Sequence, residues 1–489
     1  MKNMTIQIYN TLTRQKEEFV PLNQGHVGMY VCGPTVYGNS HIGHAKSYVF
    51  FDVMVRYLRY CGYKVLYIQN ITDVGHLTDD ADEGEDKLVK QARIDRVHPM
   101  QIAELMTRSY FEDMDALNVL RPDISPRASG HIIEQIEIIR KLVKNGFAYE
   151  TGGSVYFDVA KFPSYGKLSG RTLDESLEGT RVGTRSEKRH SADFALWKKA
   201  EGGHIMRWPS PWGEGFPGWH IECSAMSMKY LGESFDIHGG GMDNQFPHHE
   251  CEIAQSEAAT GKPFVKYWIH NNLVTVNGRK MSKSLGNFIT LKDAFKKFDP
   301  VVVRFLILQS HYRSTLDLSD DSLLGAKIGL EKLFNTIRNV RETIKKTDQD
   351  QHAGQPAIDF SSYKNRFLEA MNDDFNTPQA VAVIFDLARE ANQLLHAESR
   401  PGTETFLALN ALFSELGGMI LGIVTNDLSS TARDENDEAK LIDILVQTRQ
   451  KAKSEKAWWA ADFIRTELEA AGIRLEDKKD GTIWRKIDS

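Results

Sequence analysis

The feature that most constrains the fold is a strand, loop, helix and strand within residues 28–72. "GMYVCG" (28–33) is a short β-prone run that ends in glycine, and "KVLYIQNIT" (64–72) is a second β-prone run. Between them, apolar residues in "HAKSYVFFDVMVRYLRYCG" (44–62) recur at helical spacing, and Gly62 is a helix stop. Two strands that are joined by a crossover helix lie parallel in one sheet. The loop after the first strand then lies at the carboxyl end of that strand. The pattern therefore predicts an α/β fold around a parallel sheet.

The remaining sequence divides into regions of different periodicity, as expected for 489 residues, which are too many for one core. We expect the α/β domain to span residues 1–130 and 211–290. The region between them, 131–210, is predicted to be an insert with an amphipathic helix and a hairpin around a Thr-Gly-Gly turn. Helical periodicity dominates residues 291–425, and residues 426–489 contain a polar linker followed by about two further helices.

Composition and cysteine usage argue against a membrane protein, a secreted protein and a disulfide-rich protein. The formal net charge of −6 means that contact with nucleic acid requires local basic patches. No apolar run approaches the roughly 20 residues that span a bilayer, and "MKNMTIQIYN" lacks the long apolar segment of a secretory signal. We therefore expect a cytoplasmic protein with no membrane partner. The four cysteines, at positions 32, 61, 223 and 251, are too few and too scattered for a disulfide framework.

A His-Ile-Gly-His motif occupies residues 41–44, at the start of the first predicted helix. His41 and His44 lie at i and i+3, face the same way and can donate hydrogen bonds to phosphate oxygens. The free N–H groups and the dipole of the helix N-terminus also attract phosphate. On spacing alone, two surface histidines beside a helix cap are equally plausible. The surrounding strand and helix pattern favours a nucleotide site.

A second motif, Lys-Met-Ser-Lys-Ser at 280–284, follows an Asn-Gly turn. Lys280 and Lys283, three residues apart, suit a mobile loop that folds over a polyphosphate and neutralises charge on a leaving group. A solvated basic loop is the alternative for any such lysine pair. The presence of the histidine motif in the same chain favours the first interpretation.

A third group of residues has donor atoms suited to Zn²⁺: Cys32, Cys223, His248 and Glu252. His248 and Glu252 are at i and i+4, on one face of a predicted helix. On spacing alone, either cysteine could instead be a buried core residue. His248 and Glu252 could likewise be an ordinary side-chain pair on the helix surface.

Six blocks in the same order resemble the cysteinyl-tRNA synthetase family of class I aminoacyl-tRNA synthetases, over nearly the whole chain. The blocks are "YVCGPTVYGNSHIGHAKSYVFFD", "GWHIECSAM", "DIHGGGMDNQFPHHECEIAQS", "KMSKSLGN", "MNDDFNTPQAVAVIFDLARE" and "GIRLEDKKDGTIWR". The resemblance implies a Rossmann-like catalytic domain with a connective insert, then a helical bundle and a small C-terminal anticodon-binding domain. It also implies a ligase that activates L-cysteine with ATP and Mg²⁺ and transfers it to the 3′ adenosine of the cysteine tRNA. We expect a monomer, although the sequence does not determine the oligomeric state.

The resemblance further implies which residues form the site. Zn²⁺ would be held by Cys32, Cys223, His248 and Glu252 and would bind the thiolate of the substrate, with Cys32 also counted among the substrate contacts. Catalysis would involve His41, His44, Lys280 and Lys283, of which His41, His44 and Lys283 contact ATP. The secondary candidates are Gly240 and Asp243 for adenosine, and Trp219 and His238 for the amino-acid pocket.

Several alternatives remain open on the sequence. Cys251, at i+3 from His248, would replace Glu252 in a site with three cysteines, although adjacent helical residues project about 100° apart and only one of them faces the metal. Thr72 and Asp73 end the second predicted strand, where ligands bind in open α/β sheets, but either residue also suits a cap.

The C-terminal region raises questions of its own. Its arginines and aromatics suit stacking on splayed anticodon bases, although some of them must be core: Trp458, Trp459, Arg465, Arg474 and Trp484. Two rival functions are a cysteine ligase for an amino-sugar acceptor and an inactive RNA-binding paralogue. The long helical and C-terminal regions argue against the first rival, and the intact histidine and lysine motifs argue against the second.

Overall fold

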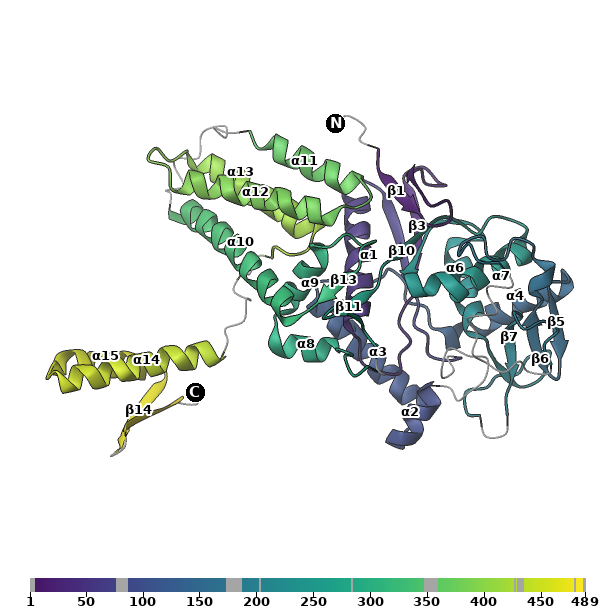
Figure 1. Cartoon of the computed structure of the whole chain (residues 1–489), viewed down its shortest axis with the longest axis horizontal. Helices are drawn as coiled ribbons and strands as arrows, with labels where there is room; N and C mark the ends of the chain where they lie inside the picture. Colours follow the sequence, from purple (N-terminus) through teal and green to yellow (C-terminus); the bar gives the residue numbers. More distant parts are fainter. Residues whose placement is uncertain are drawn as a thin grey trace. The chain divides into compact units, whose positions relative to one another are not determined.

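The computed structural model describes residues 5–75, 87–172, 187–201, 204–282, 285–346, 359–425, 428, 435–478 and 481–486. The chain separates into two compact units, Met1–Leu428 and Ser429–Ser489, which we describe one at a time (Figure 1). None of the described helices is long and apolar enough to cross a membrane.

A parallel sheet of four strands in the order β10-β9-β3-β4 lies at the centre of the first unit. Its strands are β3 (His26–Val31), β4 (Lys64–Gln69), β9 (Phe235–Gly241) and β10 (Val265–Asn271). Helix α1 (Ile42–Tyr60) connects β3 to β4, so the predicted strand, helix and strand unit is confirmed. The second strand ends three residues earlier than predicted, because the chain turns away at Asn70 towards the cavity described below.

The sheet separates two hydrophobic cores, because successive side chains of a strand point to opposite faces. Val27, Met29 and Val31 of β3 pack in the core that contains α1. Tyr30 packs in the other core, with helices α6 (Trp219–Leu231) and α7 (Glu250–Thr260). Figure 1 shows α1 on one side of the sheet and α6 and α7 on the other.

Helix α1 starts two residues earlier than predicted because His41 caps it. The Nδ1 atom of His41 accepts a hydrogen bond from the backbone N–H of Gly43 at 3.1 Å. The helix ends at Tyr60, and Gly62 follows with a φ of 92°, as expected for a glycine stop.

The predicted insert contains an amphipathic helix and a hairpin, as expected. Helix α4 (Ile132–Lys144) is followed by an antiparallel sheet in the order β5-β6-β7-β8. The strands are β5 (Ala148–Thr151), β6 (Ser154–Phe157), β7 (Phe194–Lys199) and β8 (Gly215–Pro217). Strand β8 lies past residue 210, so the sheet extends beyond the predicted end of the insert.

Residues after β10 form a small sheet and then helices. The sheet has the order β12-β11-β13, and Asn277 and Gly278, both with positive φ, make the predicted turn between β11 and β12. Its strands are β11 (Val274–Val276), β12 (Arg279–Lys280) and β13 (Leu316–Leu318). The helices that follow β12 are α8 (Leu291–Lys297), α9 (Pro300–Leu308), α10 (Asp320–Lys346), α11 (Ser361–Asn372), α12 (Thr377–Leu395), α13 (Thr403–Leu412) and η7 (Phe413–Ile420).

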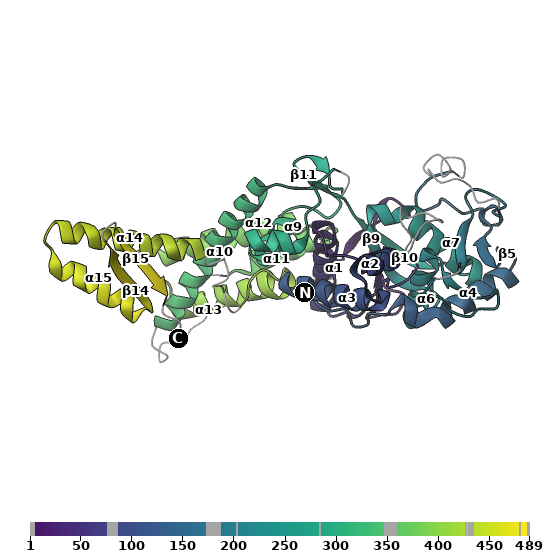
Figure 2. The ribbon, with the colours of Figure 1, turned by 90° about the horizontal axis from the view of Figure 1, so that it is seen from below.

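The helical region predicted from residue 291 is therefore confirmed. Figure 2 shows α1 and α3 between this group of helices and the parallel sheet. The remaining elements of the unit are β1 (Gln7–Asn10), β2 (Gln15–Glu18), α2 (Lys87–Asp95), α3 (Pro99–Ala116), the short helices η2 (Ala128–His131) and η3 (Val159–Lys161), and the turns η4 (Met242–Asn244) and η5 (Gln245–His249).

The second unit contains the two predicted helices and a hairpin. Its elements are α14 (Glu435–Ser454), α15 (Trp458–Ala470), β14 (Ile473–Lys478) and β15 (Gly481–Lys486). Trp458 and Trp459 are exposed, at 59% and 79%. Trp484 instead packs against the small core, and its Nε1 donates to Asp443 at 2.8 Å. Trp484 therefore stabilises the unit.

Candidate active site

A cavity of about 760 Å³ lies at the carboxyl ends of the parallel strands. Its wall is built by residues at or just after the ends of these strands, namely 32–35 after β3, Asn70 and Thr72 after β4, Gly241, Asp243 and Asn244 at the end of β9, and 271–274 at the end of β10. The N-terminus of α1 and strand β12 close it from the other side. The position is the one that the strand and helix pattern predicts for a ligand.

Most of the predicted site residues meet at this cavity. Those on its wall are Cys32, His41, His44, Thr72, Trp219, Cys223, Asp243, His248 and Lys280. His238 and Gly240 of β9 do not line it, and Glu252 lies behind Cys32. Lys283 lies outside the described residues. Asp73 has the role of a cap, since its carboxylate accepts hydrogen bonds from the N–H and hydroxyl of Ser129.

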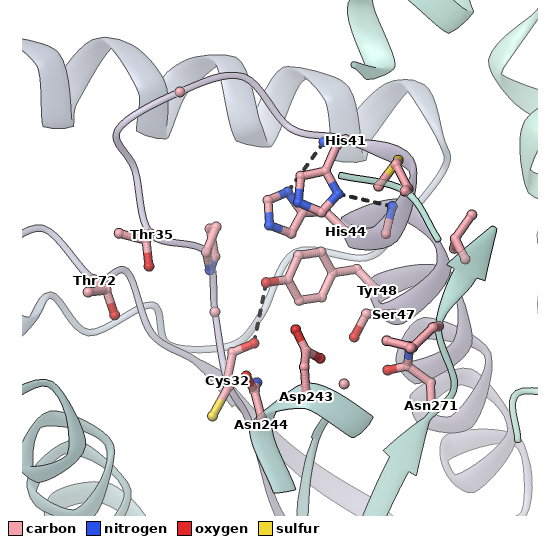
Figure 3. A pocket seen from close by; sticks show the side chains of 18 of the residues that line it. Cys32, Thr35, His41, His44, Ser47, Tyr48, Thr72, Asp243, Asn244 and Asn271 are labelled. Carbon is pink, nitrogen blue, oxygen red and sulfur yellow. Dashed lines mark hydrogen bonds between the residues drawn. The ribbon is translucent and has the colours of Figure 1, made fainter. Parts of the chain in front are cut away.

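His41 and His44 stack on each other at the start of α1, with ring centroids 3.8 Å apart (Figure 3). Each Nδ1 accepts a backbone N–H, from Gly43 for His41 and from His41 for His44. A neutral imidazole that accepts at Nδ1 carries its proton on Nε2. Burial and the neighbouring His41 hold the pKa of His44 well below its usual value, so its ring is neutral at pH 7. The arrangement fixes both rings as Nε2–H donors.

The wall also contains residues that the sequence did not single out. Tyr48 donates its hydroxyl to the backbone oxygen of Cys32 at 3.3 Å, and Figure 3 shows it beside Asp243 in the same space. Asn70 accepts the N–H of Gly33 at 2.8 Å and lies 3.8 Å from the Sγ of Cys223. Asn70 comes directly after β4. The rule that places ligands at the carboxyl ends of parallel strands, applied above to Thr72, therefore applies to Asn70 as well.

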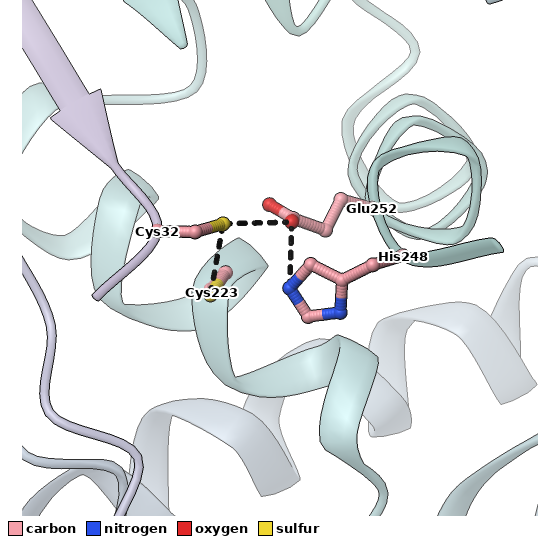
Figure 4. A group of neighbouring side chains, drawn as sticks. All are labelled: Cys32, Cys223, His248 and Glu252. Atoms are coloured by element: carbon pink, nitrogen blue, oxygen red, sulfur yellow. Dashed lines mark hydrogen bonds and ion pairs between the residues drawn. The ribbon is translucent and has the colours of Figure 1, made fainter. Parts of the chain in front are cut away.

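The four predicted metal ligands come together although they are far apart in the sequence (Figure 4). The Sγ atoms of Cys32 and Cys223 are 3.9 Å apart, and the Sγ of Cys32 is 3.8 Å from Oε1 of Glu252. Nε2 of His248 lies 3.1 Å from the same Oε1. All four side chains are buried, and their donor atoms lie within 4.8 Å of one another.

These positions fit a tetrahedral zinc ion. Bonds of 2.0–2.3 Å at tetrahedral angles place ligand atoms about 3.3–3.8 Å apart, close to the distances observed. Burial raises the pKa of both thiols, and Glu252 opposes their ionisation further. Among the described residues, Glu252 forms ion pairs with histidines only. A divalent cation would stabilise the thiolates and the carboxylate together.

Cys251 faces away from this cluster. Its Sγ lies 3.4 Å from the hydroxyl of Tyr165 and belongs to neither group of candidate ligands among the described residues. The geometry therefore favours Glu252 over Cys251. The second candidate group combines Cys32 and Glu252 with His238 and His249.

Three buried histidines support the cluster from behind. His238 lies 2.8 Å from Oε2 of Glu252, and Nδ1 of His249 lies 2.8 Å from Nε2 of His270. Nδ1 of His270 lies 2.9 Å from the hydroxyl of Thr11. Burial lowers the pKa of His249 well below its usual value and that of His270 to about 3. No local sequence pattern indicates His270, because its partners are distant in the chain.

His270→Gln is expected to reduce the loss of stability in mild acid. The pKa of folded His270, about 3, is below the ordinary value of 6.5, so the unfolded chain binds the proton first as the pH falls. The stability associated with neutral His270 is complete above pH 6.5 and is lost as the pH falls towards 3, about 2 kcal/mol of it by pH 5.

The measurement is urea unfolding of both proteins at pH 7 and pH 5. The unfolding free energy of the variant should fall less between these values, by about 2 kcal/mol. Acid release of a bound metal affects both proteins and cancels in the comparison. An equal drop in the two proteins would contradict the prediction.

Comparison with known proteins agrees with this geometry. Residues 18–328 match the family model described as tRNA synthetases class I (C) catalytic domain, and residues 366–425 match the DALR domain. In solved structures, the chain is similar to Mycobacterium tuberculosis methionyl-tRNA synthetase in complex with methionyl-adenylate. The TM-score is 0.60 at 14% identity, over 86% of this chain and 94% of the other, a likeness of fold alone.

Curated relatives share far more of the sequence. The chain is 56% identical to a protein of Chlorobium chlorochromatii named cysteine–tRNA ligase, over 98% of this chain and 99% of the relative. It is 52% identical to the protein of the same name from Deinococcus radiodurans, over 99% and 97% of the two chains. The protein of that name from Bacteroides fragilis is 51% identical, over 98% and 99%. The chain belongs to the cysteine–tRNA ligase family of class I aminoacyl-tRNA synthetases.

Proposed function

We propose that this chain activates L-cysteine with ATP and Mg²⁺, giving cysteinyl-adenylate and pyrophosphate, and then transfers cysteine to the 3′ adenosine of the cysteine tRNA. The observation that carries the proposal is the shared cavity. Three members of the cluster, Cys32, Cys223 and His248, supply one part of its wall, and the stacked histidines and Lys280 supply another. One cavity thus combines donors for a soft metal with donors for phosphate.

The cluster of Cys32, Cys223, His248 and Glu252 is proposed to hold zinc. Zinc supplies, when bound, a Lewis acid that takes a substrate thiol as its thiolate and takes the harder, less acidic hydroxyl of serine far less well. Trp219 packs on the ring of His248 at 4.3 Å between centroids and limits the space beside the cluster. His238 orients the carboxylate of Glu252 from behind rather than contacting the amino acid.

Activation in this proposal requires no protein nucleophile, because the substrate carboxylate attacks the α-phosphorus. His41 and His44 donate their Nε2–H groups to phosphate oxygens at the N-terminus of α1. Lys280 neutralises charge on the leaving pyrophosphate, and we assign the same role to Lys283. Asp243 faces the cavity and is proposed to contact adenosine.

For Gly240 we propose a packing role in place of the adenosine contact that the resemblance implies. A Cβ at Gly240 would lie 2.8 Å from the ring of His249 and 3.0 Å from the side chain of Asn244. The glycine therefore lets the buried histidine pack against β9, and we propose that it affects ATP only through that packing.

The proposal also covers the binding of the anticodon by the second unit, the location of the protein in the cell and its oligomeric state. Exposed Trp458 and Trp459 are suited to stacking on unpaired bases, and we assign them to the anticodon loop. We further propose that the protein acts in the cytoplasm as a monomer.

The test is ATP–pyrophosphate exchange that depends on cysteine, followed by charging of a cysteine tRNA transcript. We expect exchange with cysteine, exchange with serine lower by about 10⁴-fold, and charging of the tRNA. Absence of exchange in the protein with zinc bound would overturn the proposal. Exchange without charging would overturn its second step and favour a small-molecule acceptor such as an amino sugar.

A further inference from the structure

Lys46, on the second turn of α1, is a buried cation that the proposed reaction does not use. Its side chain is only 2% exposed, and none of the described carboxylates forms an ion pair with it. Burial lowers the pKa of Lys46 to about 8. A buried ammonium without a counter-ion destabilises a fold unless its donors are satisfied. The specific partners of Lys46 therefore explain why a charged residue occupies this position.

Both partners of Lys46 are backbone oxygens in the segments that support the lysine-bearing hairpin. Its Nζ donates to the oxygen of Leu273 at 3.1 Å and to the oxygen of Ser314 at 2.6 Å. Leu273 immediately precedes β11, and Ser314 lies just before β13. These two strands pair in parallel, with Val274 opposite Leu316. One side chain of α1 thus binds both strands where they begin.

The hairpin of β11 and β12 carries Lys280 to the cavity. Thr275 of β11 pairs with Lys280 of β12, so the position of Lys280 follows that of β11. Past this hairpin, the chain is tied to the start of α1 again, because Leu291 donates its N–H to Ser40 and Ile42 donates its N–H to Ile289. The chain is therefore hydrogen-bonded to α1 or to its first residues both before Lys280 and after it.

Resting on the proposed function, we propose that Lys46 is a positioning residue that sets Lys280 at the correct distance from His41 and His44. All three groups act on the same polyphosphate. Lys46 is on the helix that carries both histidines and holds the base of the hairpin that carries Lys280. Two directional hydrogen bonds to backbone oxygens fix a register that apolar packing would leave adjustable.

The geometry separates this role from recognition of the amino acid. The two hydrogen bonds of Lys46 go to the segments before β11 and β13, and not to β9 or to the helices α6 and α7 of the thiol and carboxylate cluster. A change at Lys46 should therefore affect the step in which pyrophosphate leaves, and not the binding of cysteine or zinc.

The test compares Lys46→Met with wild type, using the full chain with zinc bound. We expect kcat of cysteine-dependent exchange to fall about 10–100-fold, as for a small misplacement of a catalytic group, with KM for cysteine and zinc content unchanged. Lys46→Arg, which keeps donors for both oxygens, should restore most of the kcat. Lys296→Met is the control, because Lys296 is exposed and, among the described residues, pairs with Asp293 on its own helix alone.

A second readout does not depend on activity. Hydrogen exchange of the backbone amides in 273–282 should be faster in Lys46→Met, while amides of α6 and α7 keep their protection. A folded Lys46→Met protein with unchanged kcat and unchanged exchange at 273–282 would overturn the inference. Faster amide exchange, combined with a wild-type protein that has no cysteine-dependent activity, would overturn the proposed function and leave the bracing role of Lys46 in place.

Discussion

Cys223→Ala will lose its zinc and its cysteine-dependent exchange, whereas Cys251→Ala will keep both. Removal of the Cys223 thiol leaves three of the four proposed ligands and opens the cluster to water on the cavity side. A site built around one specific polar interaction loses orders of magnitude without it, so kcat/KM for cysteine should fall at least about 10³-fold. Metal content by atomic emission and exchange kinetics at saturating ATP provide the measurement.

Cys251 is a close control for this substitution. Both cysteines are nearly fully buried, at 2% and 1% exposure, and both replacements delete one sulfur atom from the same hydrophobic core. The two variants should therefore lose similar stability, and any difference in zinc reports ligation. Loss of zinc from Cys251→Ala alone would contradict the assignment of Glu252 as the fourth ligand.

Arg304→Met should destabilise the first unit by about 3–5 kcal/mol. The guanidinium of Arg304 is fully buried, pairs with Asp52 of α1, and donates to the backbone oxygens of Leu117, Asn118 and Leu421. The substitution leaves three carbonyls without their donor and leaves the buried carboxylate of Asp52 with Arg56 as its remaining cation. Thermal and urea unfolding, followed by fluorescence, measure the effect.

Two variants sharpen this result. Asp52→Asn combined with Arg304→Met should cost less than the sum of the two single substitutions, because both of them remove the same ion pair. Arg108→Met should cost less than about 1 kcal/mol, because Arg108 is 72% exposed and its pair with Glu104 is screened by water. Equal effects of the buried and exposed arginine substitutions would refute the argument.

Local patterns in the sequence predicted the features that depend on neighbours in the chain. The spacing of apolar residues defined α1, and Asn277 and Gly278 specified the turn that leads to Lys280. The ligand set came from ordered blocks of resemblance, since Cys32 and Cys223 belong to different elements and no short-range rule pairs them.

Other features depend on contacts between distant segments, which no local rule contains. Lys46 has the sequence context of an ordinary helical lysine, yet its partners are Leu273 and Ser314. His270 follows Trp268 in an unremarkable strand pattern, and its hydroxyl partner is Thr11. Burial of these polar groups is decided by tertiary packing, so neither their partners nor their shifted pKa values could be read from the sequence.

The alternation of side chains along β3 has a consequence for how this protein can diverge. Tyr30 points into the core shared with α6 and α7, whereas Met29 and Val31 point into the core shared with α1. Mutations that remodel the thiol cluster therefore accumulate in one core, while the helix that presents His41 and His44 is packed in the other. Selection for a different amino acid can act on one face of the sheet and leave the proposed ATP contacts intact. A single strand thus makes the two halves of the chemistry separately evolvable.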